Sequence, residues 1–322
     1  MARDWNSTRV TVIGGGGFLG SHLVDLLRSR GCEPATPRTA DGWDFRQPQS
    51  AAAFFAEHKP QVVFNCGARQ GGLAYQRQFP AEIYYDNMLL GLNSLHAAQA
   101  AGVEKYINVV AACSYPGYLD GLMSEADYWS GPLHDSVVNY GFTKKAQVVQ
   151  GWCYERQYGF NSNHLLMANL YGPREHFHPD RSHGLAALLR KFYEAKRNGA
   201  AEVQIWGTGR PVREWLFVKD AVAALVAAAE RYDKVEPLNV SVGGGLSIAE
   251  LAALIADIVG YTGELVYDSS KPDGALMKAF ANDRIREEID WSPTTELRDG
   301  IQQTLGWLDE HYERILSEEA GE

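Results

Sequence analysis

Apolar residues along this chain occur either in short continuous runs or in longer stretches with helical periodicity. Residues 10–13 form a short run rich in β-branched side chains, which leads into a glycine-rich turn and then an amphipathic stretch at 21–30. A short apolar run bounded by turn residues predicts a buried strand, whereas a repeat of about 3.6 residues predicts a helix. The chain therefore begins as strand, glycine turn and helix.

The same alternation continues as far as residue 242. Further strands are predicted at 61–66, 105–110, 164–170, 215–218 and 238–242, with helices at 81–101, 138–157 and 220–231. Alternating strands and helices predict a parallel sheet with helices on both faces. We therefore expect an α/β fold with a Rossmann-type doubly wound parallel sheet.

The pattern loosens after Tyr171-Gly-Pro173, where glycine and proline end regular structure. A helix at 183–197 and a short strand at 203–206 follow, and two more amphipathic helices are predicted at 247–259 and 297–312. We predict a dinucleotide-binding domain formed by residues 1–172 plus 215–242. Residues 173–214 plus 243–322 would form a smaller C-terminal α/β substrate lobe.

Composition and charge favour a small ligand. The 322 residues are 45% hydrophobic and 22% charged, as in ordinary globular proteins, and the net charge of −10 argues against a nucleic-acid partner. No apolar stretch is long enough to span a bilayer, and the polar N-terminus does not resemble a signal peptide. The four cysteines lack metal-ligand or disulfide-framework spacing, so we expect no metal site and a reduced, cytoplasmic location.

The glycine turn at the head of the chain predicts a dinucleotide site. Gly14, Gly17 and Gly20 have three-residue spacing around Phe18 and Leu19. In such a turn the first glycine permits the bend, the second admits pyrophosphate, and the third lets the helix pack on the strand. An ordinary glycine-rich loop is the alternative reading.

Other cofactor contacts are expected beyond this turn. Asp44 and Phe45 are candidate adenine contacts, and Gly67 and Ala68 leave room for close approach after the next strand. Arg38 follows the segment where the acidic residue of NAD-binding folds usually stands, and an arginine there accommodates a 2′-phosphate. NADP(H) is therefore the expected cofactor, with NAD(H) left open.

Tyr140 and Lys144 are candidate catalytic residues. Residues four apart share one face of a helix, and a nearby ammonium group can stabilise the anion of a phenol whose ordinary pKa is near ~10. This pairing is typical of nicotinamide redox chemistry, although alone it also occurs on ordinary amphipathic helices. The rest of the chain decides between the two.

Taken together, these motifs resemble the extended short-chain dehydrogenase/reductases, and most of all the GDP-L-fucose synthase family. Besides the glycine turn and the Tyr140–Lys144 pair, the matching stretches are 67–72, 113–116, 169–173, 177–179, 182–183, 206–209, 211–214 and 271–274. The resemblance covers residues 10–312. It implies an enzyme that epimerises C3 and C5 of a GDP-4-keto-6-deoxyhexose and then reduces C4 with a nicotinamide cofactor.

The resemblance also implies roles for individual residues. Tyr140 would protonate the C4 oxygen, Lys144 would hold the nicotinamide ribose, and Cys113 and His183 would serve as base and acid in the epimerisation. The residues implied in nucleotide binding are Asn169, Lys191, Trp206, Arg213 and Lys278. The helices at 81–101 and 138–157 would pair in a homodimer, as they do in much of the superfamily.

Two departures from the family pattern leave alternatives open. Ala111 stands where the family has a serine that hydrogen-bonds the reacting carbonyl, and Ser114 or Ser136 would have to replace it. Gly16 and Ala40 stand where the family has arginines that bind the 2′-phosphate. The alternatives are a C4 epimerase or C4-reductase without C3/C5 epimerisation, for example on a heptose, or a catalytically degraded nucleotide-sugar-binding protein.

Overall fold

The computed structural model describes residues 3–119, 121–178, 182, 184–271, 273 and 275–320. Five parallel strands of this part form the main sheet. They lie in the order β1 (Val10–Ile13), β2 (Val62–Asn65), β3 (Lys105–Ala111), β5 (Ser162–Met167) and β10 (Leu238–Val240). The predicted Rossmann-type sheet is confirmed.

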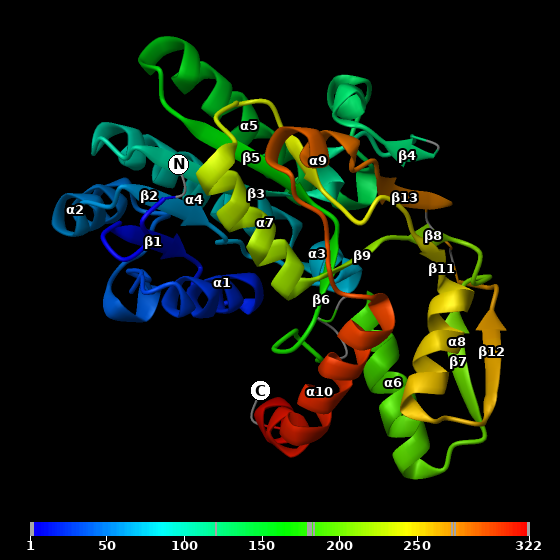
Figure 1. Cartoon of the computed structure of the whole chain (residues 1–322). Coiled ribbons are helices and arrows are strands. Elements are labelled where there is room, and N and C mark those ends of the chain that lie inside the picture. The colour runs from blue at the N-terminus through cyan, green and yellow to red at the C-terminus, as the bar shows by residue number, and fades with distance from the viewer. Residues whose placement is uncertain are drawn as a thin grey trace.

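Helices cover both faces of this sheet (Figure 1). One face packs against α1 (Phe18–Ser29) and α7 (Val218–Arg231), and the other against α2 (Pro48–His58), α4 (Pro80–Ala100) and α5 (Val138–Tyr158). Successive side chains of a strand point to opposite faces, so Val12 belongs to the first of these cores and Ile13 to the second. Both faces being buried explains why the strands read as continuous apolar runs.

A third hydrophobic core lies in the C-terminal part of the molecule. Helices α6 (Gly184–Asn198), α8 (Ile248–Val259) and α10 (Leu297–Glu319) contribute to it, together with the parallel pair β7 (Glu202–Trp206) and β12 (Glu264–Asp268). In Figure 1 these elements gather away from the main sheet. The smaller α/β lobe is thus present, while its exact division from the first domain stays a prediction.

Short strands connect the main sheet to the C-terminal core. A second sheet has the order β11 (Leu246–Ser247), β8 (Val212–Arg213), β13 (Met277–Phe280) and β4 (Leu122–Met123). Beside it, β6 (Asn169–Tyr171) pairs with β9 (Trp215–Phe217), while the short helices α3 (Leu73–Gln78) and α9 (Asp283–Ile289) complete the chain path. Strands of two to four residues carry too little periodicity for sequence analysis to detect.

Two strand predictions were wrong in part. The strand expected at 164–170 is divided, because β5 ends at Met167 and the chain then pairs through β6 with β9. Consequently the strand expected at 215–218 does not return to the main sheet, and only β10 does. The segment before Arg38 makes a single bridge, Thr11 to Ala35, because Pro34 and Pro37 have no N–H to donate to a strand ladder.

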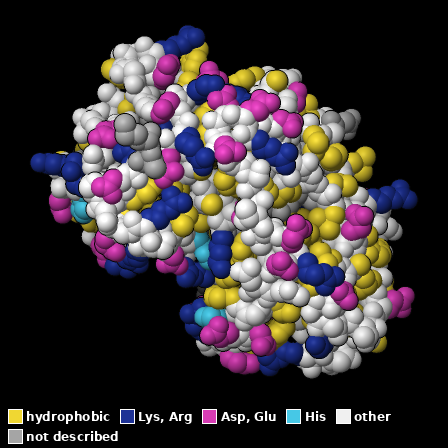
Figure 2. Space-filling view, in the orientation of Figure 1, with side chains coloured by type: hydrophobic (Ala, Val, Ile, Leu, Met, Phe, Trp, Pro, Cys, Tyr) yellow, Lys and Arg dark blue, Asp and Glu magenta, His cyan; other side chains and the backbone are white. Residues whose placement is uncertain are grey.

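The surface is of mixed charge on the face seen in Figure 2, where Lys and Arg side chains are interspersed with Asp and Glu. Among the residues that the structure describes, no helix combines the length and apolar character needed to cross a bilayer.

Candidate functional site

A cavity of about 350 Å³ opens at the carboxyl ends of β1 and β2. Five predicted cofactor residues line it: Gly14, Asp44, Phe45, Gly67 and Ala68. Strand β1 is flanked by the bridge residue Ala35 on one side and by β2 on the other. The cavity is therefore at the point where the strand order reverses. Open α/β sheets bind their ligands at such a point.

The glycine turn explains how backbone can approach a ligand here. Gly14 has φ +75°, and a Cβ on it would lie 2.8 Å from the Cα of Gly67. A Cβ on Gly20 would lie 2.1 Å from the carbonyl oxygen of Gly14, so only glycine allows α1 to pack this closely on the turn. Both positions therefore require glycine for steric reasons.

The N-terminus of α1 is suited to bind phosphate. Gly17 is its N-cap, and no side chain caps the first N–H groups, which are thus available to an anion. The Leu19 side chain belongs to the core, so Leu19 can offer only backbone to the cavity, whereas the partly buried Phe18 ring packs against His22. The turn and cavity fit the pyrophosphate and adenosine of a dinucleotide.

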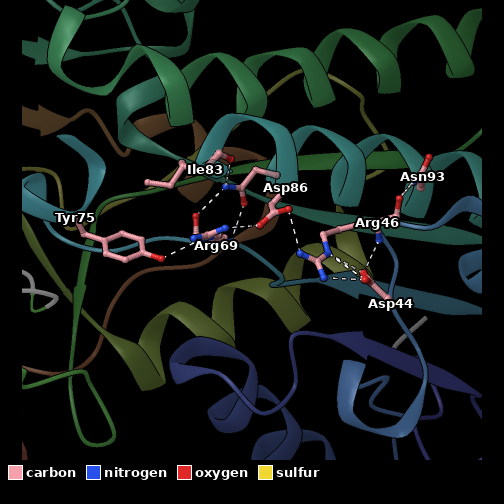
Figure 3. Close-up of polar contacts among 8 residues, drawn as sticks. Asp44, Arg46, Arg69, Tyr75, Ile83, Asp86 and Asn93 are labelled. Carbon is pink, nitrogen blue, oxygen red and sulfur yellow. Dashed lines mark hydrogen bonds and ion pairs between the residues drawn. The ribbon is translucent and has the colours of Figure 1, made fainter. Parts of the chain in front are cut away.

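An ion-pair network not predicted from sequence borders the same cavity (Figure 3). Arg46 pairs with Asp44 at 2.8 Å and with Asp86 of α4 at 3.1 Å, while Arg69 pairs with the other oxygen of Asp86 at 2.8 Å. The Arg46 side chain hydrogen-bonds Asp44 and lowers the pKa of its carboxyl group. Asp44 is thereby held ionised and fixed in place at the cavity wall.

Arg38 lies outside this network. Its guanidinium is largely exposed and pairs with Asp41 at 2.6 Å, and its neighbours Pro37 and Thr39 line the cavity. A Cβ on Gly16 would meet no atom within 4 Å, so there is open space beside the turn.

Three of the predicted catalytic residues converge near the end of β3. Lys144 is 2% exposed, its Nζ donates to the carbonyl oxygen of Val109 at 2.9 Å, and it lies 5.7 Å from the centre of the Tyr140 ring. A Cβ on Gly141 would lie 2.2 Å from the carbonyl oxygen of Cys113, so the first turn of α5 packs directly on the Cys113 backbone. The fourth residue, His183, lies outside the described residues.

Burial dominates the proton affinities in this cluster. It lowers the pKa of Lys144 to about 8 and raises the pKa of the Cys113 thiol to about 11, although Lys278 and Lys144 favour the thiolate. Burial, followed by the charge of Cys113, also raises the pKa of Tyr140. The expected acidification of Tyr140 is therefore not found, because burial disfavours the charged phenolate.

The two hydroxyl groups considered as replacements at Ala111 both have partners. Ala111 is the last residue of β3, and the Ser114 hydroxyl donates to its carbonyl oxygen at 2.7 Å. The Ser136 hydroxyl lies 2.8 Å from Nδ1 of His134. Neither is free to donate to a substrate carbonyl in this conformation.

Three of the predicted substrate residues are held together beside this cluster. Arg213 of β8 and Lys278 of β13 are direct partners in the strand register, and Asn169 Nδ2 donates to the carbonyl oxygen of Glu214 at 3.0 Å. Lys278 interacts electrostatically with both Cys113 and Arg213, and burial lowers the pKa of its ammonium group. Glu214 itself, which sequence analysis left without a role, is buried here.

The remaining two, Lys191 and Trp206, are on the C-terminal lobe. Lys191 Nζ donates to the Gln204 carbonyl oxygen at 2.8 Å, and Trp206 is 68% exposed at the end of β7. Asp273 links this region to Arg213, because it accepts from the backbone N–H of Thr208 at 2.7 Å and its carbonyl oxygen lies 3.4 Å from the Arg213 guanidinium. An exposed indole at this rim is available to contact a ligand.

Comparison with known proteins gives consistent results. The model of the NAD dependent epimerase/dehydratase family matches residues 10–243. The chain is 36% identical to "Probable GDP-L-fucose synthase 1" of Oryza sativa subsp. japonica over 94% of this chain and 92% of the relative.

Two solved structures are similar over nearly the whole chain. A GDP-D-glycero-L-gluco-heptose synthase from Campylobacter jejuni, in the presence of NADPH, has a TM-score of 0.88 at 26% identity and covers 94% of this chain and 99% of its own. A GDP-L-fucose synthetase from Naegleria fowleri bound to NADP has a TM-score of 0.85 at 25% identity and covers 95% of each chain.

Proposed function

Since the chain belongs to the NAD dependent epimerase/dehydratase family, we propose that it epimerises C3 and C5 of a GDP-4-keto-6-deoxyhexose or similar keto sugar and then reduces C4. It is a nucleotide-sugar-modifying enzyme that depends on NAD(P). The observation that carries the more specific proposal is the placement of Cys113 beside the Tyr140–Lys144 pair, with the cation of Lys278 acting on the thiol. Carbonyl reduction alone needs no thiol at this place.

In the proposed epimerisation, Cys113 removes the proton α to the C4 ketone, and His183 returns a proton from the opposite face. Electrons left on carbon move to the C4 oxygen, where a hydrogen-bond donor stabilises the enolate. Tyr140 is the buried O–H group in this cluster and is proposed to donate to that oxygen. In the reduction, Tyr140 would transfer its proton to the C4 oxygen, and a bound nicotinamide would supply the hydride that C4 receives.

Deuterium uptake tests the epimerisation. With GDP-4-keto-6-deoxymannose in D₂O and no reduced cofactor, the wild-type enzyme should place deuterium at C3 and C5, and Cys113→Ser should not. Mass spectrometry of the recovered sugar measures this. Equal uptake by the variant would remove Cys113 from the mechanism and would favour reduction without epimerisation.

Hydride transfer is tested separately with Tyr140→Phe. Removing the acid should lower the rate of cofactor oxidation by about 10²- to 10⁴-fold. Cofactor affinity, measured by fluorescence, should persist because the candidate dinucleotide cavity is lined by other residues. Unchanged turnover would refute the assignment of Tyr140.

NADP(H) is the proposed cofactor, with Arg38 as the contact to the 2′-phosphate. Two similar enzymes were solved with NADPH or NADP, and Arg38 is a largely exposed cation beside the cavity. To bind the 2′-phosphate, Arg38 must break its ion pair with Asp41. Arg38→Ala should therefore raise the KM for NADPH and leave that for NADH unchanged, and an equal effect on both would reject this contact.

A homodimer formed through α4 and α5 is also proposed. These helices expose large apolar side chains next to one another, namely Tyr84, Tyr85, Val138, Phe142, Val149, Trp152 and Tyr158. Light scattering should show a dimer that Trp152→Glu dissociates, whereas Trp129→Glu, at another exposed indole, should not.

The four unpaired thiols are consistent with the cytoplasmic location that we propose, which cell fractionation can test.

A further inference from the structure

Glu214 is a buried carboxylate at the junction of the short strands. It lies between β8 and β9 and is 1% exposed. Its two oxygens accept hydrogen bonds from the backbone N–H groups of Val242 and of Phe280, the latter at 2.8 Å. The negative charge is thus satisfied by neutral donors, which fixes the carboxylate in one position.

These donors come from segments that are distant in sequence. Val242 follows β10 of the main sheet, whereas Phe280 ends β13. The carboxylate therefore joins the edge of the main sheet to the strand that carries Lys278. Ser241 adds a direct bond between the same two segments, because its hydroxyl donates to the carbonyl oxygen of Phe280 at 2.8 Å.

The backbone of Glu214 makes two more bonds to predicted substrate residues. Its N–H donates to the carbonyl oxygen of Lys278 at 3.2 Å, and its carbonyl oxygen accepts from the Asn169 amide at 3.0 Å. Arg213 is its immediate neighbour. Glu214 is thus bonded to the Asn169 side chain and to the Lys278 backbone, and it is adjacent in the chain to Arg213.

We infer that Glu214 is a positioning residue that sets the spacing of Arg213, Lys278 and Asn169 around the diphosphate of a bound nucleotide. This inference rests on the proposed function of those three residues. Both oxygens are needed, because each accepts an N–H from a different segment. In Glu214→Gln the amide NH₂ would face one of those N–H groups, donor against donor, and would push the two segments apart.

Calorimetric titration with GDP and with NADPH tests this role in the full-length protein. Loss of one charge-assisted bond should weaken GDP binding to Glu214→Gln by about 10- to 100-fold. The dissociation constant for NADPH should stay within about twofold, and the KM for the keto sugar should rise with little change in kcat, as expected when uniform binding is lost.

Asp220→Asn is the matched control. Asp220 is 6% exposed and accepts from Thr294 N–H at 3.2 Å, the Thr294 hydroxyl at 3.0 Å and Thr295 N–H at 3.1 Å. Like the Glu214 carboxylate, it accepts hydrogen bonds from neutral groups, but none of these groups belongs to the three substrate residues. It should lower thermal stability and leave GDP binding unchanged.

The inference is overturned if Glu214→Gln binds GDP as the wild type does, or if GDP and NADPH binding fall together. If Glu214→Gln does not fold, Glu214→Asp replaces it: this variant keeps the charge but not the reach, and it must show the same selective loss of GDP binding. Wild-type protein that binds NADPH but no GDP would reject the proposed function itself, together with the premise of this inference.

Discussion

The buried ammonium group of Lys144 should cost the folded protein stability. Its pKa falls from 10.5 to about 8, a difference that corresponds to about 3 kcal/mol of unfavourable charge burial. Lys144→Met removes this cost and also removes the hydrogen bond to the Val109 carbonyl, which contributes about 1 kcal/mol. At pH 7 the variant should thus be more stable by about 2 kcal/mol, although we expect it to be inactive.

The pH dependence gives this prediction its sign. The unfolded chain keeps the Lys144 proton up to its ordinary pKa of 10.5, whereas the folded chain releases it near pH 8. The cost is therefore complete below pH 8 and disappears between pH 8 and 10.5, because the unfolded state binds more protons there. The stability advantage of Lys144→Met should shrink over this interval. At higher pH the variant should be less stable than the wild type by about 1 kcal/mol, the contribution of the lost hydrogen bond.

Urea unfolding of both proteins without cofactor, at several pH values, measures the difference in the free energy of unfolding. Lys196→Met is the control, since Lys196 also donates to a backbone carbonyl, that of Val259, but is an exposed residue. It should show no comparable pH-dependent change. A Lys144→Met protein less stable than wild type at pH 7, or a difference that does not vary between pH 8 and 10.5, would refute the reasoning.

Three further predictions concern the reaction and the glycine turn. Ala111→Ser should restore a donor to the reacting carbonyl and raise kcat by about 10²-fold, because the hydroxyl groups nearby already have partners; a slower enzyme would show a pocket adapted to alanine. Gly20→Ala should destabilise the protein by about 1–3 kcal/mol in thermal unfolding, since its Cβ would lie 2.1 Å from the Gly14 carbonyl oxygen, whereas Gly16→Ala has free space and should not. Deuterium uptake by the wild type should rise about tenfold per pH unit between about pH 6 and 8, because the pKa of Cys113 is about 11 and only its thiolate removes a proton; a flat profile would exclude that base.

The sequence predicted the elements of the main sheet well, because buried parallel strands and long helices leave strong periodic patterns. Several residues that the sequence predicted as cofactor contacts line one cavity, among them Gly14, Asp44 and Gly67. The predicted roles of the site residues stay predictions. The strand expected at 164–170 was divided in the structure, since an apolar run does not reveal where a chain changes from one sheet to another.

Other features could not be predicted because they depend on residues far apart in the chain. Asp86 joins Arg46 and Arg69 across a helix and two loops, and no motif marks such a pairing. Glu214 belongs to the matching stretch 211–214, but its inferred role depends on the N–H groups of Val242 and Phe280, which are distant in the sequence. The direction of the Tyr140 pKa shift also needed the structure, because the burial that raises this pKa cannot be judged from the sequence.

The position of β13 has a consequence for how the protein is made. This strand, Met277–Phe280, lies between β8 and β4, which come from much earlier in the chain. All strands of the main sheet are synthesised before residue 277, and domains generally fold from the N-terminus during synthesis. A nascent chain can thus form the candidate dinucleotide cavity early, while the strand that carries Lys278 joins the second sheet only after residue 280 has been made.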